Sequence, residues 1–382
     1  MIINYGRQYI DRKDIDSVKN ALKQDLITTG KFVKKFEASL SKYLNSKHVV
    51  SCNSGTSAIL MSIIALNLRK NANVIIPAIN FVAAANMCKL LGYNVFFSDI
   101  SPESGQISSK EILECAKKNN IKKIDLIFSM HLGGYPAQVI DLFKLKKKIK
   151  CYIIEDACHA LGSSYKYNGK LHKVGNGKHS DISTFSFHPL KTITTGEGGA
   201  VSTNNKYLAN RIQLIRSHGI FNKKEMNYDI KFIGYNFRLS DLNCALGFSQ
   251  MKKINKILFL RRSIFKNYLK KINNFKDVIN IMNEEYKSSS CHLVIARINF
   301  SKLKINKSKF FNILKKSGII CQFHYVPQYY FSAHKSKYVL KNTEDYYKNC
   351  ISLPIHLMIN KKKLDYIIIK IKKIIRQNIL LK

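Results

Sequence analysis

HVVSCNSGTSAILMSIIALNLRKNANVII (48–76) decides the fold, because short apolar runs at 48–51 and 73–76 flank a stretch at 56–68 with helical spacing. The two runs are short and rich in valine and isoleucine, as expected of buried strands. A strand, a helix and a second strand in succession form the unit from which parallel sheets are built. This stretch therefore predicts an α/β protein.

The same alternation continues on both sides of this stretch. It predicts a large α/β domain with a mostly parallel, seven-stranded sheet covered by helices. Polar, glycine-containing segments follow several strands, and ligands of such sheets bind at the carboxyl ends of the strands. The further predicted strands are 93–98, 124–129, 151–154, 181–186 and 199–203, and the predicted helices are 14–25, 31–44, 81–91, 109–118, 137–147 and 204–216.

The last third of the chain predicts a smaller α/β domain. A long helical pattern at 239–271 leads into it, and we place the domain boundary inside this helix, giving a large domain at 1–245 and a small domain at 246–382. The elements expected beyond the helix are strands at 292–299 and 319–325 and helices at 307–317 and 361–378.

Composition leaves two interpretations of the strong basic charge. The 382 residues carry a formal net charge of +40, which raises the hypothesis of a nucleic-acid-binding protein on an enzyme fold. Lysine is enriched together with isoleucine and asparagine, whose codons are A/T-rich, and no helix-turn-helix or zinc-finger motif is present. We therefore expect a solvated basic surface and no nucleic-acid partner.

The cysteine pattern and the first residues indicate the compartment. The nine cysteines include no CxxC pair and no zinc spacing, so we expect free thiols and no metal. The segment MIINYGRQYIDRKD (1–14) lacks the apolar region of a signal peptide. The uncharged run at 48–68 is too polar in its first part for a membrane span. We expect a cytoplasmic protein that does not enter a membrane.

Two features together indicate pyridoxal phosphate chemistry. An apolar strand ends in Asp156, and a second strand-like segment turns through a tight loop into Lys191. The cofactor needs an amine to hold its aldehyde and an anion to keep its ring nitrogen protonated. Alone, Asp156 would be interpreted as a turn or N-cap residue and Lys191 as one more exposed lysine; their combination and flanks favour the catalytic interpretation.

Neighbouring segments supply further candidates. Gly55 and Thr56 stand where a helix begins, a position that favours a phosphate, and Ser186 can add a hydroxyl. A simple N-cap remains the alternative for this segment. Phe81 either stacks on the cofactor ring or packs in the core, and His159 is either a catalytic group beside the cofactor or a hydrogen-bonded core histidine.

Taken together, these motifs resemble the DegT-type nucleotide-sugar aminotransferases, a family of fold-type I pyridoxal-phosphate enzymes. The resemblance covers nearly the whole chain, and the serine–histidine–lysine segment followed by EGG is its most specific part. The matching segments are RQYID (7–11), ITTG (27–30), NSGTSA (53–58), EDACHALGSSY (155–165), FSFHPLKTITTGEGGAV (185–201), RSHGI (216–220), GYNFRLSDLNCALGFSQM (234–251), QFHYVPQY (322–329) and SLPIH (352–356).

The resemblance implies roles for matching positions. Lys191 would hold the cofactor covalently, Asp156 would pair with its ring nitrogen, and Gly55, Thr56 and Ser186 would hold its phosphate. Asn236 would reach the phosphate in a neighbouring subunit, which implies a homodimer with active sites at the interface. The nucleotide-sugar site would be lined by Tyr5, Leu26, Ile27, Thr28, Gln322, His324 and Tyr325.

The resemblance also implies the reaction. L-Glutamate would donate an amino group to a UDP-linked keto-sugar, and the motifs are most similar to the branch that acts in pseudaminic acid biosynthesis on UDP-2-acetamido-2,6-dideoxy-β-L-arabino-hex-4-ulose. Another nucleotide-linked keto-sugar remains the alternative, because specificity depends on pocket shape. A family branch of sugar dehydratases has histidine at position 191, so Lys191 argues against that branch. Cys158 departs from the smaller or more polar residue common there.

Overall fold

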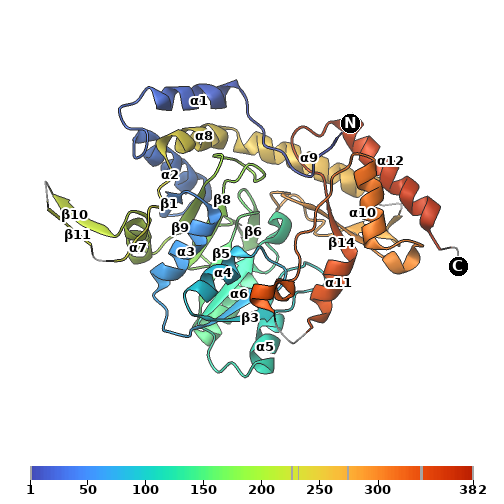
Figure 1. Ribbon diagram of the computed structural model, residues 1–382, viewed down its shortest axis with the longest axis horizontal. Coiled ribbons are helices and arrows are strands. Elements are labelled where there is room, and N and C mark those ends of the chain that lie inside the picture. Colours follow the sequence, from blue (N-terminus) through green and yellow to red (C-terminus); the bar gives the residue numbers. More distant parts are fainter. Residues whose placement is uncertain (1, 225–226, 231, 273–274, 336–338, 381–382) are drawn as a thin grey trace.

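The computed structural model describes residues 2–224, 227–230, 232–272, 275–335 and 339–380. In these ranges a seven-stranded sheet has the order β1-β9-β8-β5-β4-β2-β3 (Figure 1). β9 runs antiparallel to β1 and β8, and the other neighbouring pairs are parallel, so the predicted mostly parallel sheet is confirmed. Its strands are β1 (His48–Cys52), β2 (Asn73–Pro77), β3 (Asn94–Ser98), β4 (Leu126–Met130), β5 (Tyr152–Asp156), β8 (Ile182–Ser186) and β9 (Gly199–Thr203).

Helices cover both faces of this sheet because successive strand residues point in opposite directions. Ile76 and Ile154 pack in one apolar cluster with α3, α4 and α7, whereas Ile75 and Ile153 pack in another with α5 and α6. The helices are α3 (Gly55–Leu66), α4 (Ala83–Leu90), α5 (Ser109–Lys118), α6 (Val139–Ile149) and α7 (Lys206–Arg216).

A third cluster joins the sheet to helices at the start and middle of the chain. Phe36 and Leu40 of α2 are fully buried there with Cys244 and Ala245 of α8. The predicted single helix at 239–271 is wrong in one respect: it divides at Lys253, whose ammonium lies 2.7 Å from Asp11 and 2.5 Å from Asp14. The helices are α1 (Arg12–Leu22), α2 (Lys31–Leu44), α8 (Asp241–Lys252) and α9 (Ile254–Ile272).

The C-terminal part has its own apolar cluster, which begins at Ile264 within α9 and also includes Ile3. The boundary at 245/246 falls inside α8 and stays a prediction. This part contains a three-stranded antiparallel sheet in the described ranges. Its elements are β12 (Ile279–Ile281), β13 (Val294–Ile298), η3 (Phe300–Lys302), α10 (Lys307–Lys316), η4 (Gln328–Tyr330), η5 (Ser332–His334), α11 (Lys341–Asn349), β14 (Cys350–Leu353) and α12 (Lys361–Asn378).

The strand predicted at 319–325 is wrong. Ile319 makes an isolated bridge to Ile3, and Gln322 makes another to Ser352. The segment therefore pairs briefly with two different partners and forms no continuous ladder with either. This arrangement brings the N-terminal segment, the segment around His324 and the end of β14 together.

Two hairpins complete the description. The first is β6 (Ser164–Tyr167) with β7 (Lys170–Lys173), in which the hydroxyl of Tyr165 lies 2.7 Å from Nδ1 of the buried His179. The second is β10 (Ile220–Lys224) with β11 (Asn227–Ile230), which projects from the body of the molecule (Figure 1). A short 3-10 turn, η1 (Leu132–Gly134), follows β4. No helix in the described ranges is both long and apolar enough to cross a bilayer.

Candidate active site

A cavity of about 350 Å³ opens at the carboxyl edge of the large sheet. Its walls are loops and helix starts that follow β1, β2, β4, β5 and β8, joined by the N-terminal segment and two segments of the C-terminal part, as expected for a parallel sheet. The lining residues are Tyr5, Ser54, Gly55, Thr56, Ile59, Phe81, Ala83, Met130, Asp156, Cys158, His159, Ser186, His188, Leu190, Lys191, Glu197, His292, His324 and Tyr325.

Lys191 stands on the return from β8 to the antiparallel β9. The turn is held by the Lys191 N–H donating to the His188 carbonyl at 2.9 Å and by the Thr195 N–H donating to the Phe187 carbonyl at 3.0 Å. Burial lowers the pKa of Lys191, and the negative charges that Cys158 and Asp156 can carry oppose this shift. A lowered pKa increases the fraction of free amine, the form that attacks carbonyl carbon.

Asp156 is the last residue of β5 and is 3% exposed. Its Oδ1 accepts the N–H of Cys158 at 3.2 Å, which orients the carboxylate at the strand end. Asp156 lines the same cavity as Lys191 and acts electrostatically on it. The structure thus brings the two predicted catalytic residues together.

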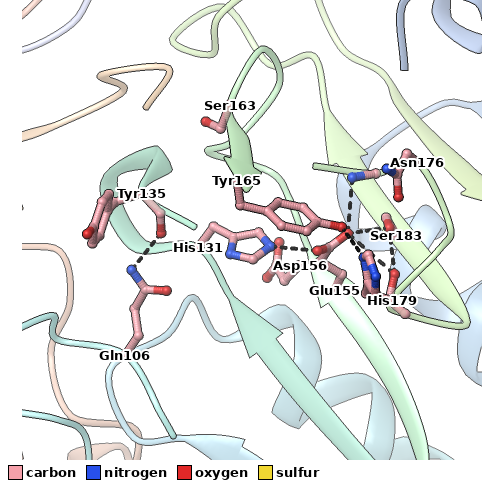
Figure 2. A network of polar contacts seen from close by, with 12 residues as sticks. Gln106, His131, Tyr135, Glu155, Asp156, Ser163, Tyr165, Asn176, His179 and Ser183 are labelled. Atoms are coloured by element: carbon pink, nitrogen blue, oxygen red, sulfur yellow. Dashed lines mark hydrogen bonds and ion pairs between the residues drawn. The ribbon is translucent and has the colours of Figure 1, made fainter. Parts of the chain in front are cut away.

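Glu155 precedes Asp156 on β5 and points to the other side of the strand (Figure 2). Its Oε1 lies 3.0 Å from Nε2 of His131, and its Oε2 accepts the Ser183 hydroxyl at 2.6 Å and the Gly175 N–H at 3.1 Å. Burial alone would raise the pKa of Glu155, but the contact with His131, its charge and the other hydrogen bonds lower the pKa overall. This buried network lies behind the strand that carries Asp156.

A cradle suited to a phosphate lies where α3 begins. Ser54 is the N-cap, with its hydroxyl accepting the Ser57 N–H at 3.0 Å, and the free N–H groups of the first turn face an anion favourably. A Cβ at Gly55 would come within 2.9 Å of the Ser186 Cβ and 3.3 Å of its hydroxyl oxygen. Gly55 therefore keeps open the space beside Ser186, while Thr56 lines the same cavity.

Aromatic side chains form another part of the cavity wall. The ring of Phe81 lies 6.0 Å from that of Tyr325, and the ring of Tyr5 lies 5.5 Å from that of His324. Phe81 is 53% exposed, which excludes core packing. His159 is 1% exposed, and its Nε2 lies 2.9 Å from the Tyr325 hydroxyl, so it is both buried and part of the cavity wall.

Five predicted site residues do not line this cavity. Leu26, Ile27 and Thr28 lie in the exposed loop between α1 and α2, where the Ile27 carbonyl accepts the Asp241 N–H at 3.0 Å. Gln322 is exposed and pairs through its backbone with Ser352. Asn236 is exposed beyond the β10–β11 hairpin. Their binding roles stay predictions.

The cavity also contains residues that the sequence did not single out. His188 and Leu190 lie beside Lys191 in the HPLK segment, and Glu197 lies in the EGG segment, so their closeness to Lys191 in the sequence is the signal that marks them. His292 comes from the approach to β13 in the C-terminal part, and no local pattern marks it. The described residues contain no group of three or more metal-ligating side chains in binding arrangement.

These residues fit pyridoxal phosphate. Lys191 offers an amine, Asp156 offers a carboxylate at the strand end, and the opening at Gly55 leaves room for a phosphate against the first turn of α3. An amine, an anion for the ring nitrogen and an anion-binding turn are the groups that this cofactor requires.

Comparisons with known proteins agree. The model of the DegT/DnrJ/EryC1/StrS aminotransferase family matches residues 8–372. A UDP-4-amino-4,6-dideoxy-N-acetyl-β-L-altrosamine transaminase of Campylobacter jejuni is 39% identical over 371 residues, covering 96% of each chain. The transaminase of the same name from Helicobacter pylori is 33% identical over 371 residues, covering 95% of each chain.

Solved structures give the same result. Helicobacter pylori PseC, an aminotransferase involved in the biosynthesis of pseudaminic acid, has a TM-score of 0.89 and 32% identity, covering 99% of this chain and all of that one. The apo form of a sugar aminotransferase from Streptococcus pneumoniae, Spr1654, has a TM-score of 0.88 and 25% identity, covering 99% and 98%. The chain belongs to the DegT/DnrJ/EryC1/StrS aminotransferase family.

Proposed function

We propose that this protein uses pyridoxal phosphate to transfer the amino group of L-glutamate to C4 of a UDP-linked 4-keto-6-deoxy-N-acetylhexosamine, UDP-2-acetamido-2,6-dideoxy-β-L-arabino-hex-4-ulose, a step of pseudaminic acid biosynthesis. The observation that carries the proposal is the presence of Lys191, Asp156 and the opening at Gly55 in one cavity. The family and the altrosamine transaminases among the relatives support it.

The bound cofactor supplies an aldehyde that exchanges with amines and a ring that withdraws electrons from the carbon being deprotonated. Asp156 would pair with the ring nitrogen and keep it protonated, which maintains that withdrawal. Ser186 and the first turn of α3 would bind the phosphate. Tyr325, His324 and Tyr5 form the wall against which the sugar is placed.

Lys191 moves the proton in both halves of the reaction. With the cofactor bound, its amine would take the proton from Cα of glutamate as a general base, in the half-reaction that converts glutamate to 2-oxoglutarate. In the other half-reaction it would give a proton to C4 of the keto-sugar, which gains the amino group. Burial, which lowers the pKa of Lys191, favours the basic form that this shuttle needs.

We propose that the enzyme is a homodimer with active sites at its interface. The β10–β11 hairpin projects from the body, and Tyr228, Ile230 and Ile233 nearby are 61%, 56% and 86% exposed (Figure 1). Exposed apolar side chains on a projecting element are characteristic of an interface. Asn236, which follows the hairpin, would then reach the phosphate of the partner's cofactor.

A panel of keto-sugars tests the substrate. Enzyme, cofactor and L-glutamate are incubated with UDP-, GDP- and dTDP-linked keto-sugars, and amino-sugar products are identified by mass spectrometry. We expect amination of the UDP-linked 4-keto-N-acetylhexosamine. Amination of a GDP- or dTDP-sugar alone would replace the proposed substrate, and a protein that binds no pyridoxal phosphate would overturn the proposed activity.

A further inference from the structure

His292 reaches the cavity from the C-terminal part of the chain and has no role in the chemistry above. It is 6% exposed, and its ring packs on that of His159 with centroids 4.1 Å apart. Its Nδ1 is shut off from solvent and has no hydrogen-bond partner among the described residues. The ring therefore contributes by packing on its neighbour.

The backbone of Gly133 contacts both histidines. The Gly133 N–H donates to the imidazole Nδ1 of His159 at 3.4 Å, and the Gly133 carbonyl accepts the backbone N–H of His292 at 2.9 Å. Gly133 has a φ of +69°, a conformation that glycine adopts without strain. The 3-10 turn after β4 thus connects the His159 ring to the backbone that carries His292.

These contacts fix the proton on His159. Nδ1 accepts a hydrogen bond, so the proton of the neutral ring lies on Nε2. Nε2 faces the Tyr325 oxygen at 2.9 Å and donates to it, which leaves the Tyr325 hydroxyl hydrogen free to point elsewhere. Burial, followed by Lys191, His292 and His324, lowers the pKa of His159 well below its usual range, so a second proton is disfavoured.

The position of His292 is itself built into the fold. Arg261 of α9 is 2% exposed and donates through one guanidinium nitrogen to the Cys291 carbonyl at 3.3 Å and the His292 carbonyl at 3.5 Å. Helix α9 therefore holds the backbone that carries the imidazole of His292. Cys291, which precedes His292, has a φ of +51°, a conformation that a non-glycine residue rarely adopts. The contacts around this residue must therefore hold its backbone in place.

We propose that His292 is a positioning residue: packed on His159, it keeps that ring protonated at Nε2 toward Tyr325, whose hydroxyl then donates to an oxygen acceptor of the bound ligand. The identity of the acceptor rests on the proposed function, and the phenolic oxygen of the cofactor and the keto oxygen of the sugar share the required chemistry. The state of His159 does not depend on that function.

Nitrogen NMR of the full chain labelled with ¹⁵N-histidine tests the first step. Resonances of His159 are assigned by their loss in His159→Gln. We expect one neutral ring with its proton on Nε2 in the wild type and in His292→Phe, which keeps a packed ring, and a mixture of both forms in His292→Ala. A proton on Nδ1 in the wild type, or a mixture in His292→Phe, overturns the proposal whatever the enzyme catalyses.

Ligand binding tests the second step. Calorimetry measures the affinity for pyridoxamine phosphate, and kinetics measure KM for the keto-sugar. Tyr325→Phe should weaken one of the two about tenfold, as expected for one hydrogen bond of about 1.4 kcal/mol, and the affected ligand identifies the acceptor. Unchanged values for both ligands overturn the donor role.

Variants of His159 supply the matched control. His159→Gln places a donor near the Nε2 position and should weaken binding of the ligand that Tyr325→Phe affects less than His159→Asn does. His159→Asn can replace only the Nδ1 acceptor and should resemble Tyr325→Phe. The reverse order would overturn the assignment of Nε2 as the donor.

Discussion

Lys191 differs from the other basic residues of this chain by its surroundings. Sixty-four lysines and arginines give the protein its charge of +40, and sequence alone does not distinguish a catalytic lysine from an exposed one. Lys191 is placed by the β8–β9 return in a cavity with Asp156, and burial lowers its pKa. A group with a lowered pKa beside a specific charged partner in a cleft is a candidate for catalysis.

Replacing Lys191 by alanine should abolish covalent attachment of the cofactor and lower transamination by about 1000-fold or more, because both the attachment and the proton shuttle are lost. Borohydride treatment in the presence of pyridoxal phosphate, followed by mass spectrometry of peptides, measures the attachment. Lys206→Ala, at an exposed position on α7, should behave as the wild type. Retained attachment in Lys191→Ala would show that another amine is used.

Asp156→Asn should bind the cofactor but lower the rate by about 100-fold, since a neutral amide does not keep the ring nitrogen protonated. The amide oxygen can still accept the Cys158 N–H, so the free energy of unfolding should change by only about 1 kcal/mol. Rate and urea unfolding are compared with Glu114→Gln, which alters an exposed carboxylate on α5. An undiminished rate would contradict the assigned role.

Site residues could be predicted from the sequence only where the residues next to them form a recognisable motif. Asp156 and Lys191 have distinctive flanks, and the structure places both in the cavity, as it does Gly55, Ser186, Phe81 and His159. His292 has no such flank, because it reaches the site through the packing of the C-terminal part against η1. Contacts between segments distant in the sequence are set by tertiary packing, which local patterns do not encode.

At the scale of elements, the start of α3 combines a helix N-terminus with a close approach between Gly55 and β8. Gly55→Ala would bring a methyl group within 2.9 Å of the Ser186 side chain and 3.5 Å of the Cys158 sulfur. We expect about tenfold weaker binding of pyridoxal phosphate, measured by calorimetry. The unfolding free energy of the cofactor-free protein should not fall by more than about 1 kcal/mol, because alanine favours helices. Equal loss of stability and affinity would indicate general damage.

The contact between His131 after β4 and Glu155 in β5 predicts a pH-dependent stability. The pKa of Glu155 is lowered from its usual value of 4.5, so its ionised form contributes stability above that pH, and the contribution is lost as pH falls below it. Glu155→Gln should cost about 3 kcal/mol at pH 7, the cost of breaking a buried pair. Urea unfolding at several pH values should show a smaller difference toward pH 4. A constant difference would contradict this linkage.

Element positions were predicted well where one periodicity dominates. α12 and β9 lie where the pattern places them, whereas the predicted strand at 319–325 and the undivided helix at 239–271 are wrong. In both cases contacts with residues distant in the sequence determine the local structure. Ile3 and Ser352 pair with the segment at 319–325, and Asp11 and Asp14 contact Lys253 where the helix divides. The hairpin β10–β11 was missed because its segment is rich in lysine and asparagine.

At the scale of the whole molecule, the projecting hairpin predicts a dependence of activity on assembly. Ile233→Asp places a charge on a side chain that is 86% exposed in one chain. If this surface is covered in a dimer, the variant should shift toward monomer in sedimentation experiments and bind pyridoxal phosphate at least tenfold more weakly. Leu113→Asp, on the exposed side of α5, should remain dimeric. A dimeric Ile233→Asp with full affinity would argue against the interface.

The overall architecture was accessible from the sequence because strands and helices alternate from β1 to β5. The last two strands of the large sheet, β8 and β9, follow without a helix between them. The association of the N-terminal segment with the C-terminal core, through Ile3, was not accessible, since it joins the two ends of the chain.

Glu155 and Asp156 of β5 face different surroundings because consecutive side chains of a strand point to opposite sides. Losing or gaining one amino acid upstream within β5 would exchange their directions, sending Glu155 toward the cofactor and Asp156 into the histidine contact. We therefore expect β5 to tolerate no insertion or deletion of one residue, whereas the turn at 119–123, in which Asn120, Lys122 and Lys123 are exposed, should tolerate them. In a library of random insertions, β5 should appear as a gap among the recovered clones.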